Sequence, residues 1–136
     1  MFHILICDDE PFVCKEIEQA LIACGIEKQI DVKVESFASG EKLLAYMGQN
    51  QDIDLLFLDI ELPGSNGAET GVKIRDELKN EKVQIVYISS YEQYAMQLFR
   101  VRPFDFLIKP VTRHMIAHIF EKYIRIFEDN TQFFEY

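Results

Sequence analysis

Four short stretches of the chain are almost entirely apolar and rich in Ile, Leu, Val and Phe. Runs of this length and composition are typical of strands that are buried on both faces of a parallel sheet. A fifth stretch alternates apolar and polar residues, which predicts a strand nearer the sheet edge with one face in water. The expected strands cover residues 2–7, 32–37, 54–58, 83–88 and 104–108.

The segments between these strands carry apolar residues at helical spacing and begin or end at capping residues. Pro11 suits a first helical turn, and Ser39 and Thr112 are N-cap residues. Gly25 is expected to end the first helix, and Pro103 to follow the end of the fourth. The expected helices cover residues 11–24, 40–47, 68–80, 91–101 and 113–127. Right-handed crossovers would then place helices on both faces of one five-stranded parallel sheet, an α/β three-layer sandwich.

Composition narrows the class of protein. A chain of 136 residues is the size of one domain, and its net charge of −9 argues against binding nucleic acid by itself. No apolar run approaches the ~20 residues of a membrane span, and the first residues lack the charged start of a signal peptide. The three cysteines, Cys7, Cys14 and Cys24, have no metal-site spacing. We therefore expect a cytoplasmic protein with reduced thiols and no membrane partner.

Polar residues follow four of the apolar runs directly. They are Asp8 with Asp9, then Asp59, Ser89 and Lys109. In an open α/β sheet, ligands bind just beyond the carboxyl ends of the strands. Two acids, a third acid, a hydroxyl and a lysine would therefore meet at one edge. That set suits Mg²⁺ and a phosphoryl group.

The adjacent acids Asp8 and Asp9 have two interpretations. A hard divalent cation would explain the crowding, with one carboxylate binding directly and the other through water or from behind. The alternative is that they only cap the first helix and interact favourably with the positive end of its dipole. Asp59 favours the metal-binding interpretation. Three clustered carboxylates repel one another and raise the pKa of at least one of them, unless cations lie between them. A carboxylate placed like that of Asp59 can also act as a nucleophile toward phosphorus.

Several short motifs follow one another along the chain, each at the end of an expected strand. They are ICDDEP at 6–11, LDIELPG at 58–64 with NG at 66–67, ISS at 88–90 and LIKP at 107–110. Together they resemble the receiver domain of two-component response regulators, from residue 2 to about residue 127. The resemblance implies a flavodoxin-like (βα)₅ fold with strand order 2-1-3-4-5.

The resemblance also implies a role for each site residue. Asp59 would be the phosphoacceptor, taking a phosphoryl group from a sensor histidine kinase. Mg²⁺ would be held by Asp8, Asp9, Asp59 and the backbone carbonyl of Glu61. The domain would then be a switch that speeds its own phosphorylation and hydrolysis, rather than a turnover enzyme.

Other residues would bind the phosphate or change position in response to it. The position of Lys109 directly after an expected strand lets it reach inward and pair with Asp59 or a phosphate oxygen. The resemblance makes Ser89 the switch hydroxyl, pairs Lys109 with the phosphate, and makes Phe106 an aromatic that turns inward. The alternative for Phe106 is an ordinary core aromatic. The residues expected to flank the site are Ser90, Tyr91 and Pro110, the last with a cis peptide bond as one option. The side chains of Glu61 and Tyr91, which also flank it, would affect the lifetime of the phosphorylated form.

Finer features are similar to receivers that precede a LytTR-type DNA-binding domain, notably SYEQYA at 90–95 and FDFLIKP at 104–110. The resemblance implies a transcriptional regulator that binds DNA only through a C-terminal domain. Serine replaces the commoner threonine at Ser89, and Arg102-Pro103 stands where many receivers have Gly-Ala.

We expect a receiver domain over 1–127, and a polar linker followed by a strand-like, truncated start of an output domain over 128–136. The alternative is a stand-alone receiver with a hydrophobic tail.

Four apolar side chains of the fourth expected helix, Tyr91, Tyr94, Met96 and Phe99, cannot all face inward at about 3.6 residues per turn. One interpretation is a homodimer face formed by this helix and the following strand, as the resemblance implies. The other is amphipathic packing with one stray aromatic.

Rival functions share parts of the chemistry. A haloacid-dehalogenase-type phosphatase also uses an aspartate nucleophile with Mg²⁺, but there the nucleophile ends the first strand and the acid pair comes late. A flavodoxin must bind a phosphate dianion at its first loop, which Asp8, Asp9 and Glu10 would repel. A degenerate receiver that only docks proteins would have lost part of the residue set, which is complete here.

Overall fold

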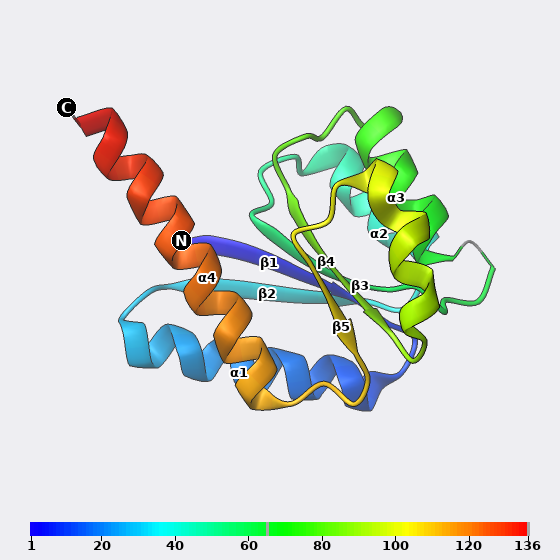
Figure 1. Ribbon diagram of the computed structural model, residues 1–136, viewed down its shortest axis with the longest axis horizontal. Coiled ribbons are helices and arrows are strands. Elements are labelled where there is room, and N and C mark those ends of the chain that lie inside the picture. The colour runs from blue at the N-terminus through cyan, green and yellow to red at the C-terminus, as the bar shows by residue number, and fades with distance from the viewer. Residues whose placement is uncertain (65, 136) are drawn as a thin grey trace.

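Strands and helices alternate along the whole chain (Figure 1). A computed structural model describes the backbone of residues 1–64 and 66–135, and the side chains of these residues except 96, 97 and 127–135. The strands are β1 (Phe2–Cys7), β2 (Val32–Phe37), β3 (Leu55–Asp59), β4 (Gln84–Ser89) and β5 (Asp105–Ile108). The helices are α1 (Pro11–Lys28), α2 (Gly40–Gln49), α3 (Gly67–Asp76), the 3₁₀ helix η1 (Glu92–Val101) and α4 (Arg113–Glu135).

The five strands form one parallel sheet in the order β2-β1-β3-β4-β5. This confirms the expected strand order. Every residue of the central strand β3 is buried, whereas residues of the edge strand β2 are half-buried or exposed. The alternating pattern of β2 and the continuous apolar run of β3 therefore predicted their places in the sheet correctly.

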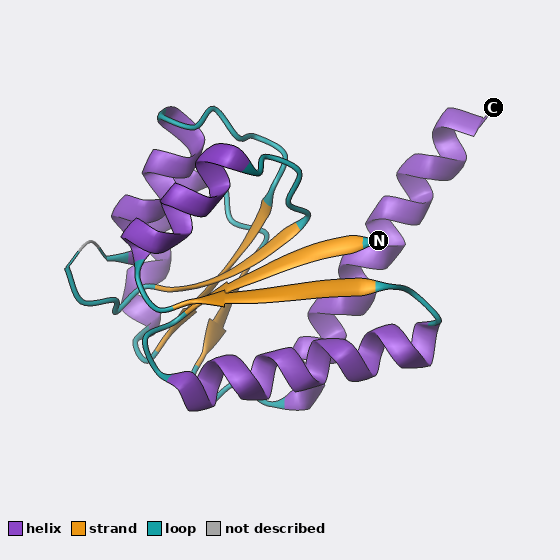
Figure 2. Ribbon diagram, turned by 180° about the vertical axis from the view of Figure 1, so that it is seen from behind, coloured by secondary structure: helices purple, strands orange, loops and turns teal. Residues whose placement is uncertain are grey.

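Helices cover both faces of the sheet (Figures 1 and 2). Because successive strand residues point to opposite faces, Ile4 and Ile6 belong to the core under α1 and α4. Leu5 and Cys7 belong to the core under α2, α3 and η1. The predicted three-layer sandwich is thus confirmed, and parallel strands bring all five carboxyl ends to one edge. None of the described helices is long and apolar enough to cross a membrane.

The first helix is longer than expected. It runs through Gly25 and ends at Lys28, followed by Gln29 at φ 58°. A Cβ at Gly25 would lie 2.8 Å from the carbonyl oxygen of Ile30, so glycine is required there by the return of the chain into β2. The prediction that Gly25 stops the helix was wrong because a close backbone approach, and not a cap, explains this glycine.

Two other helices differ from the prediction. Helix α3 ends at Asp76, before Asn80, because the Asn80 side chain accepts the backbone N–H groups of Lys82 and Val83 and forms a turn. The fourth helix, η1, is a 3₁₀ helix. A 3₁₀ helix rises about 2.0 Å per residue against about 1.5 Å for an α-helix, so it spans a longer distance between fixed ends.

The end of the chain also differs from the prediction. Helix α4 begins after the Thr112 cap and continues to Glu135. Its last turns extend past the rest of the fold in both views (Figures 1 and 2). The predicted strand-like conformation of residues 132–135 was therefore wrong, whereas the assignment of 128–136 to a linker and the start of an output domain stays a prediction, and Tyr136 lies outside the described residues. This segment contains no Gly or Pro that would interrupt the backbone bonds of a helix.

Candidate functional site

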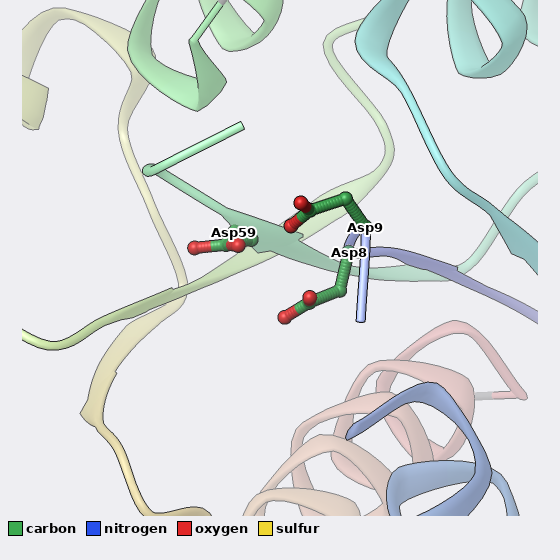
Figure 3. Close-up of side chains that lie close together, drawn as sticks. All are labelled: Asp8, Asp9 and Asp59. Carbon is green, nitrogen blue, oxygen red and sulfur yellow. The ribbon is translucent and has the colours of Figure 1, made fainter. Parts of the chain in front are cut away.

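Three carboxylates meet at the carboxyl ends of β1 and β3. Asp8, Asp9 and Asp59 each place an oxygen within 4.8 Å of the others, and Figure 3 shows their side chains turned toward a common space. Asp8 and Asp59 are only 1% exposed, whereas Asp9 is exposed. Helix α1 begins after Glu10, whose own side chain makes no capping bond, and Asp8 Oδ1 accepts the Glu10 backbone N–H at 2.9 Å. The capping interpretation therefore describes one oxygen of Asp8 and does not account for the clustering with Asp59.

Lys109 joins this cluster from the end of β5. Its Nζ lies 3.2 Å from Asp8 Oδ2, 3.4 Å from Asp59 Oδ2 and 3.6 Å from Glu10 Oε1. The expected pairing of Lys109 with Asp59 is confirmed, and the peptide bond from Lys109 to Pro110 is cis. One ammonium group therefore faces a surplus of carboxylates.

The surplus of negative charge changes how these groups hold protons. Burial and the charge of Asp8 raise the pKa of Asp59 to about 7, and burial raises the pKa of Asp8 above its ordinary value. Burial lowers the pKa of Lys109, but the charges of Asp59 and Asp8 outweigh it and leave the pKa above its ordinary value. The expectation that crowding raises a carboxylate pKa is confirmed.

The donor set fits a hard divalent cation. Asp8 Oδ2 is buried and receives no hydrogen bond from the residues that the structure describes, although Lys109 Nζ lies 3.2 Å away. Oxygen ligands from two carboxylates, with room for water, are what Mg²⁺ prefers. A hollow of about 440 Å³ between the start of α1 and the end of β2 is lined by both Asp8 and Asp9.

The loop after β3 folds back over the site. Asp59 Oδ1 accepts the backbone N–H of Glu61 at 3.0 Å, and Gly67 donates its N–H to the Ile60 carbonyl at 3.0 Å. A Cβ at Gly67 would collide with the carbonyl oxygen of Asp59, so only glycine allows this return. Asn66 then caps α3 by accepting the N–H of Glu69. The turn predicted from Asn66-Gly67 therefore positions Asp59.

The end of β4 brings hydrogen-bond donors to the same edge. The Ser89 hydroxyl donates to the Tyr91 carbonyl at 3.1 Å and accepts the Tyr91 N–H at 3.0 Å. The Ser90 N–H donates to Glu61 Oε1 at 2.8 Å. Burial raises the pKa of Glu61, but hydrogen bonds led by that of Ser90 outweigh it and lower the pKa.

The side chain of Glu61 was expected to flank the site with that of Tyr91, and its backbone carbonyl to bind Mg²⁺. The hydrogen bond between the Glu61 side chain and the Ser90 N–H was not predicted. The available signal was an acidic residue two positions after Asp59, in a loop that the turn residues bring back over the sheet edge.

The remaining predicted residues lie around the cluster. Phe106 is half-buried and packs with the core under α3 and η1. Tyr91 is 52% exposed, with its ring centroid 6.1 Å from that of Tyr94. Pro110 and Lys109 line a second hollow of about 370 Å³ against the first turns of α1. Cys7 lies in the core as a free thiol, and burial raises its pKa to about 12.

Comparisons with known proteins agree with this geometry. The sequence model of the response regulator receiver domain matches residues 4–121. The sensory transduction protein LytT of Bacillus subtilis is 30% identical over 95% of this chain and 51% of its own length. The transcriptional regulatory protein LytR of Staphylococcus aureus is 32% identical over 87% of this chain and 45% of its own length. The chain thus spans about half the length of these relatives.

Solved structures share the fold. The response regulatory domain of protein mrkE from Klebsiella pneumoniae superposes with a TM-score of 0.81 at 23% identity, covering 94% of this chain and 99% of that one. The BeF₃-activated receiver domain of DrrB gives a TM-score of 0.73 at 19% identity, covering 92% and 98%. The sequence match, the strand order and the acidic edge together establish that this chain belongs to the response regulator receiver domain family.

Proposed function

We propose that this domain accepts a phosphoryl group on Asp59 from the phosphohistidine of a sensor histidine kinase, with Mg²⁺ as cofactor. The observation that carries the proposal is the position of the Asp59 carboxylate. It is buried at a strand end, shares a cluster with Asp8 and Asp9, and lies 3.4 Å from Lys109 Nζ. A buried carboxylate surrounded by groups that bind cations and phosphate suits a phosphoryl acceptor better than a structural ion pair.

The chemistry is a transfer between two nucleophiles. An Asp59 oxygen attacks phosphorus, the P–N bond breaks, and the histidine leaves with the electron pair of that bond. Lys109 stabilises the negative charge on the phosphoryl oxygens. Mg²⁺, held by Asp8, Asp9, Asp59 and the Glu61 carbonyl, would supply further charge screening. Crowded carboxylates are otherwise poorly suited to receive an anion.

The output of the transfer is a change of conformation. The Ser89 hydroxyl leaves Tyr91 and bonds the phosphoryl group, and Phe106 follows it inward. Tyr91 lies at the start of η1, so this exchange alters how η1 is held. A population shift of a few kcal/mol at η1 is enough to change partner binding.

Acetyl phosphate tests the proposal. With Mg²⁺ we expect one phosphoryl adduct per chain, labile to hydroxylamine, detected by intact-mass spectrometry. Asp59→Asn is expected to lose the adduct, whereas Asp52→Asn, at an exposed carboxylate, retains it. Chelation of Mg²⁺ is expected to suppress it in the wild-type protein. An adduct that persists in Asp59→Asn would exclude Asp59 as the acceptor.

We further propose that this receiver controls a DNA-binding output domain in a cytoplasmic transcriptional regulator. The support is the likeness to relatives named sensory transduction and transcriptional regulatory proteins, which are about twice as long. The receiver would span 1–127, with 128–136 leading to the output domain. The reading frame of the source gene tests this proposal: we expect a β-rich segment after Tyr136, and a stop codon there would exclude it.

A homodimer face is proposed on η1 and β5. Tyr91, Phe99 and Ile108 are 52%, 88% and 36% exposed, while the side chain of Met96 lies outside the described residues. We expect beryllofluoride with Mg²⁺ to shift wild-type protein toward dimer in light-scattering chromatography, and Phe99→Ser to stay monomeric. Equal masses with and without beryllofluoride would contradict this face.

A further inference from the structure

The Glu61 side chain connects two loops of the site. Its Oε1 accepts the Ser90 N–H at 2.8 Å, so the loop after β3 is tied to the loop after β4. Its Oε2 is buried and receives no hydrogen bond within the described part of the chain. Burying a carboxylate oxygen without a donor is unfavourable. The side chain is therefore held in place by the Ser90 N–H against this penalty.

Both donors at the end of β4 are already in use. The Ser89 hydroxyl donates to the Tyr91 carbonyl, and the Ser90 N–H donates to Glu61. Hydroxyls and successive backbone N–H groups are the groups with which proteins bind anions. In this resting arrangement, an anion on Asp59 would find neither of them free.

Glu61 also lies beside the proposed acceptor. Its backbone N–H donates to Asp59 Oδ1 at 3.0 Å, and its side chain returns to Ser90, the residue after the end of β4. In the sheet, Asp59 pairs with Ile88, two residues before Ser90. A phosphoryl group on Asp59 and the Glu61 carboxylate would therefore be two anions next to one N–H donor.

We propose that the Glu61 carboxylate is a built-in competitor of the phosphoryl group. It occupies the Ser90 N–H in the resting domain and must leave before a phosphoryl group on Asp59 can bond there. Release of Glu61 also unties the two loops, so the same event frees the start of η1. This inference rests on the proposed function, because it assumes that Asp59 receives the phosphoryl group.

Beryllofluoride, a stable phosphoryl mimic, tests the competition at equilibrium. In Glu61→Ala we expect affinity for beryllofluoride, measured by calorimetry at saturating Mg²⁺, to rise on the order of tenfold, because one charge-assisted bond no longer has to break. Glu61→Gln should gain less, since its amide oxygen still accepts from Ser90. Affinity for Mg²⁺ alone is expected not to rise in either variant. The matched control is Glu92→Gln, which removes an exposed carboxylate at the start of η1 and should leave the affinity unchanged.

A second readout follows the Ser90 N–H directly. In ¹⁵N-labelled protein without ligand, Glu61→Ala should move the Ser90 amide proton upfield, and beryllofluoride should return it downfield. Unchanged beryllofluoride affinity in Glu61→Ala, equal gains in the Ala and Gln variants, or an unmoved Ser90 resonance would each overturn the competition. Failure of wild-type protein to bind beryllofluoride would instead overturn the proposed function, and the competition with it.

Discussion

Arg75 and Lys109 are both cations withdrawn from water, and their surroundings are opposite. Arg75, on α3, is 4% exposed and donates to three main-chain carbonyls: Nε to Val101 at 2.9 Å, and Nη1 to Asn80 at 3.0 Å and Val83 at 2.8 Å. Lys109 has a side chain 17% exposed and lies within 3.6 Å of three carboxylates. Arg75 is therefore surrounded by carbonyl dipoles, whereas Lys109 is surrounded by more negative charges than it can balance.

The difference separates a structural group from a functional one. The Arg75 guanidinium presents several donors in a fixed plane, and carbonyl dipoles satisfy them without adding a charge that can titrate. It fastens the end of η1 to α3 and to the turn before β4. Around Lys109 the negative charges are not balanced, so protons, Mg²⁺ and a phosphoryl group can all change the state of the site.

Removal of Arg75 is expected to have the largest effect. Arg75→Met leaves the carbonyls of Val101 and Val83 buried with a lost partner, and we expect the free energy of unfolding to fall by about 4 kcal/mol. Urea denaturation followed by circular dichroism measures this change. Arg100→Met, which removes an exposed ion pair with Asp76, should lose less than about 1 kcal/mol. Equal losses in the two variants would contradict the structural role of Arg75.

Removal of Lys109 should affect chemistry more than folding. In Lys109→Met we expect the rate of phosphorylation by acetyl phosphate to fall about 100-fold, since phosphoryl charge loses its fixed cation. The time course of adduct formation by mass spectrometry measures this rate. Lys15→Met removes an exposed lysine of the neighbouring hollow and serves as the control. A wild-type rate in Lys109→Met would remove the distinction between the two buried cations.

The charge surplus should appear in the pH dependence of stability. Asp59 has a pKa of about 7 in the folded chain, above its ordinary value, so the folded state holds the proton more tightly than the unfolded state. Without metal, stability is therefore expected to fall as pH rises from about 4 to about 7. Asp59→Asn should flatten this decline and be more stable than wild type at pH 7.5 by about 2 kcal/mol. Thermal unfolding across this pH range measures the change in stability. A steeper decline in Asp59→Asn than in the wild-type protein would contradict the prediction.

The smallest expected effect lies beside Arg75. Arg102 has φ 58°, a left-handed conformation that favours glycine, and its charge lowers the pKa of Arg75 further, after burial. Arg102→Gly should raise the free energy of unfolding by about 0.5 kcal/mol, because relief of backbone strain outweighs the loss of an exposed ion pair with Glu81. Urea denaturation again measures it. Arg113→Gly, near the start of α4, should destabilise instead.

The sheet was predictable because its signal is local. The apolar run of β3 and the alternating pattern of β2 gave their places correctly, and the capping roles of Ser39 and Thr112 are confirmed. Errors arose where a contact outside the periodic pattern of the element decides the outcome. Gly25 was interpreted as a helix stop, yet Ile30 explains it. The end of η1 is held by the hydrogen bond from Arg75 Nε to the Val101 carbonyl, a contact between residues 26 apart that no local pattern reports.

The same division holds at the site. Asp8, Asp9, Asp59, Ser89 and Lys109 were found because polar residues directly after apolar runs must lie at the edge of a parallel sheet. The burial of Arg75 and the hydrogen bond from Ser90 to the Glu61 side chain were not predicted, since a charged residue on a helix or in a loop has no pattern that marks it as buried. The partners of these side chains are main-chain groups of other elements, which any sequence can supply.

By itself, then, the sequence determined the order of elements, the burial of the strands and the set of polar residues at the carboxyl edge. These follow from periodicity and from the geometry of a parallel sheet. The tertiary structure alone decided which polar atoms have hydrogen-bond partners and which groups would compete for the same donor. Hydrogen bonds such as Glu61 to Ser90 and Arg75 to Val101 depend on distances set by packing between segments far apart in the chain.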